Sequence, residues 1–190
     1  MIDGSSATHP TLWEYDERGR LKKESKRIDT STGSTFTFYT SFTYNSADLP
    51  VTMTYPDGEV VTNTYDDRMA LETVIGNNAY VSNINYDSAG RMTLRALGNG
   101  KNQIFGYYGW TEQVNGIGQG GRLKSLFTSG LQNMTYQYDA AGNVKQIVNA
   151  RASETSVYGY DALNRLTSWQ LNQNPVKNFS TVQMRVKDQS

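Results

Sequence analysis

The sequence has no cysteine and only one histidine among its 190 residues. Without cysteine the chain cannot form a disulfide, a thiolate nucleophile or a cysteine-bound zinc site. A serine–histidine triad or a histidine metal cluster would depend on His9 alone, so both are nearly excluded. We therefore expect a protein that is not an enzyme and that uses no metal or other cofactor. Catalysis would rest on a pair of the recurrent aspartates, whose regular placement in turns favours backbone capping instead.

Net charge and long apolar runs are also lacking. The 18 basic residues balance 18 acidic ones, so no overall field draws the chain to nucleic acid or to an anionic membrane. No apolar stretch approaches the roughly 18 residues that span a bilayer. The first residues lack the basic and apolar regions of a secretory signal. We expect neither a nucleic-acid partner nor a membrane span.

Aromatic residues are abundant, with thirteen tyrosines, six phenylalanines and three tryptophans. Such side chains pack well on the pleated surface of a sheet. The stretch "YVSNINY" at 80–86 alternates as a half-buried strand does, and no segment sustains helical spacing between credible caps. The sequence predicts an all-β protein.

One phrase recurs along the chain: "YDERGRL" at 15–21, "YDSAGRM" at 86–92, "YDAAGNV" at 138–144 and "YDALNRL" at 160–166. Weaker copies begin at Tyr44 and Tyr65, and "IGQGGRL" from Ile117 is taken as a further copy that has lost its Tyr and Asp. The seven starts are Tyr15, Tyr44, Tyr65, Tyr86, Ile117, Tyr138 and Tyr160. Their period of about 21, with two insertions of roughly ten, indicates a repeat architecture.

The phrase predicts a tight hairpin. Its Asp suits the first position of a type I turn, and its Gly supplies the left-handed residue that closes a three-residue loop. Met69 does not suit that position, so we expect the turn after Tyr65 to be distorted or differently built. "YPDG" at 55–58 is a second hairpin signal, which joins neighbouring repeats. The motif residues are Tyr15, Asp16, Gly19, Tyr44, Asn45, Tyr65, Asp66, Tyr86, Asp87, Gly90, Gly121, Tyr138, Asp139, Gly142, Tyr160, Asp161 and Asn164.

These copies, with "TYPDGEVV" at 54–61, resemble the RHS or YD repeats of Rhs polymorphic toxins, Tc toxin C-type subunits, wall-associated proteins and teneurins. The resemblance covers about 13–171, leaving an N-terminal flank of residues 1–12 and a tail of 172–190 with one candidate strand. It implies tandem β-hairpins that form an extended, curved antiparallel sheet, a segment of a spiralling shell. It also implies a secreted or cell-surface structural protein, whose partners are the remainder of a larger shell or an enclosed toxin or effector domain.

Alternatives stay open beside this interpretation. Trp110, Tyr107 and Tyr108 fall in the long insertion and are candidates for stacking on a ligand, so a surface module that binds carbohydrate or a partner protein is the leading rival. "GIGQGG" at 116–121 matches a dinucleotide fingerprint, but the repeat register explains Gly121, so we interpret the match as chance. Unpaired sheet edges predict self-association, with increased burial of Tyr136, Tyr138, Tyr158 and Tyr160.

Overall fold

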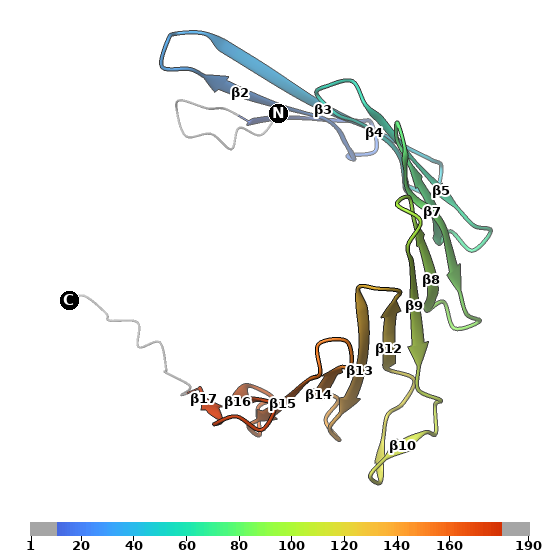
Figure 1. The fold of residues 1–190 in the computed structure, drawn as a ribbon. Helices are drawn as coiled ribbons and strands as arrows, with labels where there is room; N and C mark the ends of the chain where they lie inside the picture. Colours follow the sequence, from blue (N-terminus) through green and yellow to red (C-terminus); the bar gives the residue numbers. More distant parts are fainter. Residues whose placement is uncertain (1–10, 180–190) are drawn as a thin grey trace. The chain divides into compact units, whose positions relative to one another are not determined.

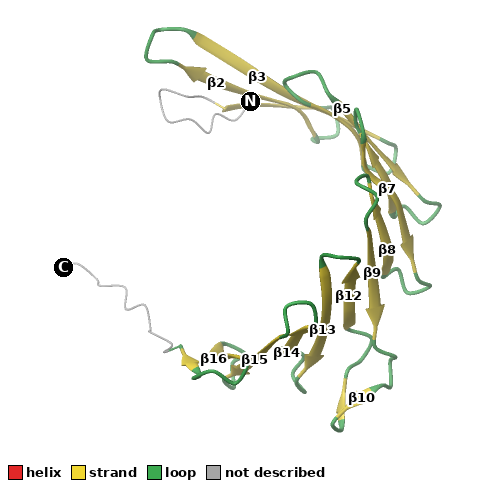
Figure 2. Cartoon of the chain, in the orientation of Figure 1, coloured by secondary structure: helices red, strands yellow, loops and turns green. Residues whose placement is uncertain are grey.

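The computed structural model describes residues 11–179, and within that range it contains strands and turns but no helix (Figure 2). The predicted all-β fold is confirmed. The chain divides into two units, residues 1–100 and residues 101–190, and each is described by itself. The strand predicted from the alternation of Val182, Met184 and Val186 lies outside the described residues, as does His9.

The first unit is an antiparallel sheet in which every strand pairs with the next strand of the chain. The motif hairpins are β1–β2, β3–β4, β5–β6 and β7–β8, and the intervening pairs β2–β3, β4–β5 and β6–β7 join them. The strands are β1 Thr11–Tyr15, β2 Leu21–Asp29, β3 Thr35–Tyr44, β4 Pro50–Thr54, β5 Val60–Tyr65, β6 Leu71–Ile75, β7 Ala79–Tyr86 and β8 Met92–Leu97.

The second unit repeats this plan with one interruption. Its sheet has the order β9-β12-β13-β14-β15-β16-β17, and the short strands β10 and β11 form a separate two-stranded ribbon between β9 and β12 in the sequence. The strands are β9 Asn102–Tyr107, β10 Gln113–Val114, β11 Ile117–Gly118, β12 Leu123–Thr128, β13 Gln132–Tyr138, β14 Val144–Asn149, β15 Glu154–Tyr160, β16 Leu166–Leu171 and β17 Lys177–Asn178.

Each unit is a single layer of strands, as the ribbon in Figure 1 shows. Very few apolar side chains in the described residues are buried: Val61 and Ile84 in the first unit and Tyr108 in the second. A layer without a second layer against it buries little apolar area per residue. The contacts that join one hairpin to the next therefore carry much of the stability, as in other repeat proteins.

The motif turns have the predicted geometry. The Asp16 amide donates to the Arg20 carbonyl at 2.9 Å, and the Gly19 amide donates to the Asp16 carbonyl at 3.0 Å. Gly19 has φ of 76°, which a residue with a Cβ adopts only at a cost. Positive φ was also predicted for Gly90 and Gly142, and it is confirmed at 76° and 94°. The ladder shifts register just before each motif tyrosine, for example between Glu14 and Tyr15.

The prediction for Met69 was wrong. Met69 has φ of 63°, its amide donates to the Asp66 carbonyl at 2.8 Å, and the Asp66 amide donates to Ala70 at 2.8 Å. The turn after Tyr65 is therefore built like the others. The hydrogen bonds around Asp66 determine the backbone path, and Met69, which is 62% exposed, accepts the left-handed conformation.

Two substitutions with opposite expected effects on the free energy of unfolding test this turn geometry. We expect Gly90→Ala to lower the free energy of unfolding by about 1 kcal/mol, because alanine is disfavoured at positive φ. A Cβ there would meet no atom within 4 Å, so the cost is that of the backbone alone. We expect Met69→Gly to raise the free energy of unfolding by about 0.5 kcal/mol, since the relieved strain exceeds the added chain entropy.

Urea unfolding followed by circular dichroism measures both effects. Gly90→Asn is the matched control, because the chain itself places Asn164 at the equivalent turn position with φ of 58°. Its loss should be smaller than that of Gly90→Ala. Equal losses for the asparagine and alanine variants would contradict the left-handed requirement.

The two insertions have different structural outcomes. The first lengthens the hairpin β2–β3, whose strands have nine and ten residues. The second lies inside a motif turn, and here the sequence interpretation was wrong: the fifth repeat begins at Tyr107, not at Ile117. Tyr107 pairs with Leu123 as Tyr15 pairs with Leu21. With this start, the step into the fifth repeat also equals the basic period of about 21, and the second insertion follows Tyr107.

Candidate functional site

In five of the seven motifs an aspartate organises its own turn. Oδ1 of Asp87 accepts hydrogen bonds from the amides of Ala89 and Arg91, both at 2.9 Å, and its Oδ2 accepts one from Nε of Arg91 at 2.7 Å. Asn45 makes the same backbone contacts through its side-chain oxygen, to Ala47 and Leu49 at 3.0 Å. The recurring carboxylates are thus engaged within the turns rather than paired for acid–base catalysis.

These contacts lower the pKa values of the motif aspartates. The backbone amide of Arg91, followed by its side chain, holds the pKa of Asp87 below its ordinary value. The hydrogen bond from the Arg20 side chain is the main cause of the lowered pKa of Asp16. The side chain of Asn143, and after it the backbone amide of Asn143, lowers the pKa of Asp139. The pKa values of Asp66 and Asp161 are lowered in the same way, chiefly by backbone amides.

The lowered pKa values predict a loss of stability in acid. A carboxyl whose pKa is depressed in the folded state contributes stability that is present above the unfolded pKa of about 3.9. That contribution is lost as the pH falls through the lower, folded pKa. We therefore expect the free energy of unfolding to be nearly constant from about pH 7 to pH 5 and to fall steadily below about pH 4. Urea titrations at a series of pH values measure the profile.

The variant Asp87→Asn is the matched control for that profile. It keeps the side-chain oxygen that Asn45 uses in its own turn, but it removes one titrating group. The variant should be less stable than the wild type at neutral pH, because the ion pair with Arg91 is lost. Its stability should also fall less steeply in acid. An unchanged acid slope would contradict the assignment of this carboxyl to the acid loss.

The motif tyrosines join each hairpin to the one before it. The Tyr44 hydroxyl donates to the Leu21 carbonyl at 2.8 Å, and the Tyr86 hydroxyl donates to the Leu71 carbonyl at 2.8 Å. The sequence predicted packing for these rings but not this hydrogen bond. The same bond recurs elsewhere, as Tyr65 to Pro50 at 2.7 Å, Tyr138 to Leu123 at 2.9 Å and Tyr160 to Val144 at 2.9 Å.

Arginines at the ends of the turns reinforce the junction between hairpins. The Arg20 guanidinium lies 4.7 Å from the centre of the Tyr44 ring and donates to Oδ1 of Asp48 in the following turn at 2.6 Å. Arg122 lies over Tyr138 at 5.4 Å. Cation–π and hydrogen-bond contacts therefore run from one repeat to the next. We call the turn, its arginine where it has one, and the following motif tyrosine the repeat junction.

The fifth repeat closes its long turn with a buried side chain. Gln119, within "GIGQGG", is fully buried. Its Oε1 accepts from the Tyr138 amide at 3.0 Å, and its Nε2 donates to the carbonyls of Ile117 at 3.0 Å and Tyr138 at 3.3 Å. The segment continues into strand β12 rather than into the helix that a dinucleotide fingerprint needs. Nothing in the repeat pattern marks Gln119, which sequence reasoning missed.

The three rings that were candidates for ligand stacking lie in different surroundings. Tyr108 is only 5% exposed, and its hydroxyl donates to the Tyr136 carbonyl at 2.7 Å, so its face is not available to a ligand. Tyr107 is the half-buried motif tyrosine of the fifth repeat. Trp110 is 68% exposed in the insertion, with its ring close against Gly121. Stacking on a carbohydrate at Trp110 stays a prediction.

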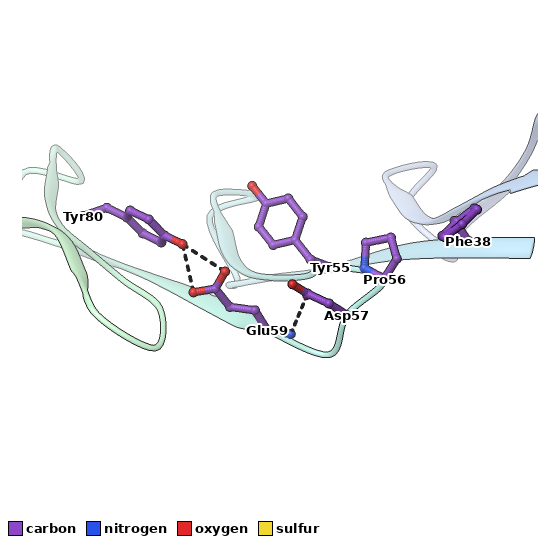
Figure 3. A pocket seen from close by; sticks show the side chains of 6 residues that line it. All are labelled: Phe38, Tyr55, Pro56, Asp57, Glu59 and Tyr80. Carbon is purple, nitrogen blue, oxygen red and sulfur yellow. Dashed lines mark hydrogen bonds between the residues drawn. The ribbon is translucent and has the colours of Figure 1, made fainter.

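An open pocket of about 570 Å³ lies beside the predicted "YPDG" turn of the first unit (Figure 3). Tyr55, Pro56 and Phe38 lie in a row along it, and the Tyr80 hydroxyl points to the Glu59 carboxylate, donating at 2.9 Å. This contact raises the pKa of Tyr80. The lining residues are Phe38, Tyr55, Pro56, Asp57, Glu59 and Tyr80, which include two carboxylates and no cation.

The structure also bears on metals and membranes. Among residues 11–179, no three or more His, Asp or Glu side chains are grouped so that they could hold a metal ion. The same stretch has no helix that is long and apolar enough to cross a membrane.

Comparison with known proteins identifies the repeat. The RHS Repeat family model matches residues 15–60 and 138–168. No curated protein matches the chain significantly. The crystal structure of TcdB2-TccC3-Cdc42 superposes with a TM-score of 0.66 at 19% identity, covering 85% of this chain and 9% of its own. The crystal structure of TcdB2-TccC3 gives a TM-score of 0.64 at 17% identity, covering 85% of this chain and 11% of its own.

A structure of the Photorhabdus luminescens Tc holotoxin pore is similar as well, with a TM-score of 0.66 at 19% identity over 88% of this chain and 9% of that one. The chain thus spans about a tenth of the length of the structures it matches. At these identities the likeness shows the fold. The hairpins and their repeat junctions define a tandem β-hairpin repeat protein. The RHS Repeat model over residues 15–60 and 138–168, together with the fold, confirms the predicted resemblance to the RHS/YD-repeat family.

Proposed function

We propose that this chain is a length of wall in an RHS shell that encloses or displays a toxin or other effector domain. The role is structural, and the wall itself carries out no catalysis. Its partners are the remaining repeats of the shell and the domain that the shell holds. Such a shell acts outside the cell, so we place the chain among secreted or cell-surface proteins.

The repeat junction is the observation that supports this proposal most strongly. The junctions join a turn to the next hairpin through a tyrosine hydroxyl, as Tyr138 does to Leu123, and some add an arginine over that ring, as Arg122 does. Contacts of this kind extend a sheet one hairpin at a time without a shared core. A single layer with so few buried side chains suits a wall, which separates two compartments, better than a compact domain.

Exposed apolar side chains on the sheets support the same proposal. Phe36 is 53% exposed in the first unit, while Ile104 and Phe127 are 46% and 42% exposed in the second. Large apolar surface of this kind marks a face that another part of an assembly covers. Within a shell, further repeats and the enclosed domain would supply that cover.

Sedimentation equilibrium tests the proposal on the chain itself. A segment of wall should self-associate as its concentration rises, because unpaired edges and uncovered faces can pair between copies. Hydrogen exchange should show added protection around Tyr136, Tyr138, Tyr158 and Tyr160 in the associated form. A strictly monomeric species that folds cooperatively up to tens of micromolar, on the order of usual working concentrations, would show that the chain needs no further wall.

Whether the shell encloses or displays an effector domain is tested on the full gene product. Limited proteolysis should leave an enclosed effector domain intact while the surrounding repeats remain folded, and a mild denaturant should expose both together. An effector that is digested at once beside an intact wall would favour display over enclosure. A gene product that contains no domain besides the repeats would contradict both.

A further inference from the structure

The lengthened hairpin β2–β3 leaves half of β3 without a partner on one side. β3 pairs with β2 along Thr35–Ser41. It pairs with β4 only along Ser41–Tyr44. In the part of the chain that the structure describes, no strand therefore pairs with Thr35–Thr40 on the β4 side. β4 instead ends at Thr54, and its turn enters Tyr55 and Pro56 at the point where a longer β4 would have continued.

The register shows which peptide groups face this open edge. The Thr30 amide donates to the Ser34 carbonyl at 2.8 Å, so residues 30 and 34 are a hydrogen-bonded pair. Such pairs alternate along an antiparallel ladder, so the N–H and C=O groups of Phe36 and Phe38 point to β2. Those of Thr35, Thr37 and Tyr39 point outward, toward the side that no strand covers.

The aromatic pocket lies at the end of this open edge. Phe38 belongs to both, and Tyr55, Pro56 and Asp57 continue the pocket across the turn (Figure 3). Phe36 lies two residues from Phe38 and so shares its face of the strand. They are 53% and 44% exposed. The open edge therefore has backbone groups that no described strand pairs with, two exposed phenylalanine rings on one face and carboxylates at its end.

We propose that the outer edge of β3 along Thr35–Tyr39 and the adjoining pocket bind an extended polypeptide, which adds to the sheet as a strand. Outward N–H and C=O groups at alternate residues are matched by an extended main chain, which presents the same groups at the same spacing. Neither a sugar nor a helix has that pattern. The site lies beyond the role of the chain as a wall and does not depend on it.

The pocket specifies the side chains of the bound segment. A β-branched or other apolar residue opposite Phe38 would pack against that ring and against Tyr55. A lysine or arginine where the segment reaches the turn would meet Asp57, which lies in a pocket lined by two carboxylates and no cation. Pro56 has no amide to donate, so the turn itself cannot complete the ladder with β3.

A labelled synthetic peptide tests this site. The probe is a capped peptide of about six residues, with alternating valine and threonine and a lysine at each end, so that either orientation places a lysine at the turn. We expect saturable binding by fluorescence anisotropy to the intact chain. We also expect the amide protons of Thr35, Thr37 and Tyr39 to exchange more slowly in the complex, whereas those of Phe36 and Phe38 are already protected by β2.

Matched controls separate strand addition from general stickiness. The same peptide with N-methyl groups on alternate amides keeps its side chains but loses its donors, and it should bind at least about tenfold more weakly. Thr37→Pro removes one outward donor without touching the ladder to β2 and should weaken binding similarly. Thr37→Val keeps that donor and should bind as the wild type does. Asp57→Asn should weaken the lysine peptide but not an analogue with threonine at its ends.

Three results would overturn the proposal. The first is equal affinity for the N-methylated and unmethylated peptides. The second is binding that leaves the exchange of the Thr35, Thr37 and Tyr39 amides unchanged. The third is that the wild-type chain binds no peptide while Thr37→Pro abolishes its self-association. A second copy of the chain would then be the occupant of the edge. Circular dichroism confirms that each variant is folded before its binding is interpreted.

Discussion

Replacing Gln119 with leucine is expected to lower the free energy of unfolding of the second unit by about 3 kcal/mol. The glutamine amide is fully buried and serves both the N–H and the C=O of Tyr138. Leucine fills a similar volume but offers neither a donor nor an acceptor. The change would leave a buried peptide group unsatisfied, which costs more than the loss of an exposed hydrogen bond.

Urea unfolding followed by tryptophan fluorescence measures this effect. The matched control is Gln113→Leu, an identical change at an exposed position on β10, which should alter stability by no more than about 0.5 kcal/mol. Gln119→Glu is a second test, because it keeps an acceptor for the Tyr138 amide but places a buried carboxylate against the carbonyls of Ile117 and Tyr138, so its loss at neutral pH should be at least as large as that of the leucine variant. Equal stability of the leucine variant and the wild type would show that water replaces the side chain.

The hairpins could be predicted from the sequence because the motif encodes its turn locally. An Asp that caps two amides and a left-handed residue three positions on are sufficient to close the loop, as Asp87 and Gly90 show. Local chemistry of this kind survives in the sequence as a spacing. The prediction for Met69 was wrong because the backbone path of this turn depends on Asp66 and on the paired strands more than on the conformational preference of Met69.

The fifth repeat could not be placed correctly from its motif, because the aspartate position is taken by Tyr108 and the turn is interrupted by a ribbon. One signal was present: the step from Tyr86 to Tyr107 equals the basic period of about 21. The role of Gln119 had no such signal. It depends on a loop folding back onto a strand that begins well beyond it in the sequence, and only the fold brings them together.

The open edge of β3 was present in the sequence only as an irregular interval. The long separation between the first two motif tyrosines, Tyr15 and Tyr44, showed that something was added, but not whether it formed a loop, a ribbon or a longer hairpin. The aromatic and β-branched residues of "TFTFYTSFTY" at 35–44 favour a strand, and these residues form β3. Its missing partner follows from the short turn at Pro56, which is a property of the neighbouring hairpin.

Substitutions at Tyr138 have the second large expected effect on the free energy of unfolding. They separate the contribution of a motif tyrosine's ring from that of its hydroxyl. We expect Tyr138→Ala to lower the free energy of unfolding by about 3 kcal/mol, because it removes a half-buried ring together with its hydroxyl bond to Leu123. Tyr138→Phe keeps the ring under Arg122 and should cost about 1 kcal/mol, the net value of one hydrogen bond.

The matched control for Tyr138→Phe is Tyr158→Phe. Tyr158 is also half-buried and lies in the neighbouring hairpin, but the structure of residues 11–179 shows no hydrogen bond from its hydroxyl. That variant should change stability by no more than about 0.5 kcal/mol. Both variants are measured by urea unfolding. If they lose the same amount, the hydroxyl bonds between hairpins contribute nothing measurable, and the repeat tyrosine would owe its place to ring packing alone. A loss confined to Tyr138→Phe would instead explain why the repeat uses tyrosine rather than phenylalanine: its hydroxyl holds each hairpin to the carbonyl of the one before.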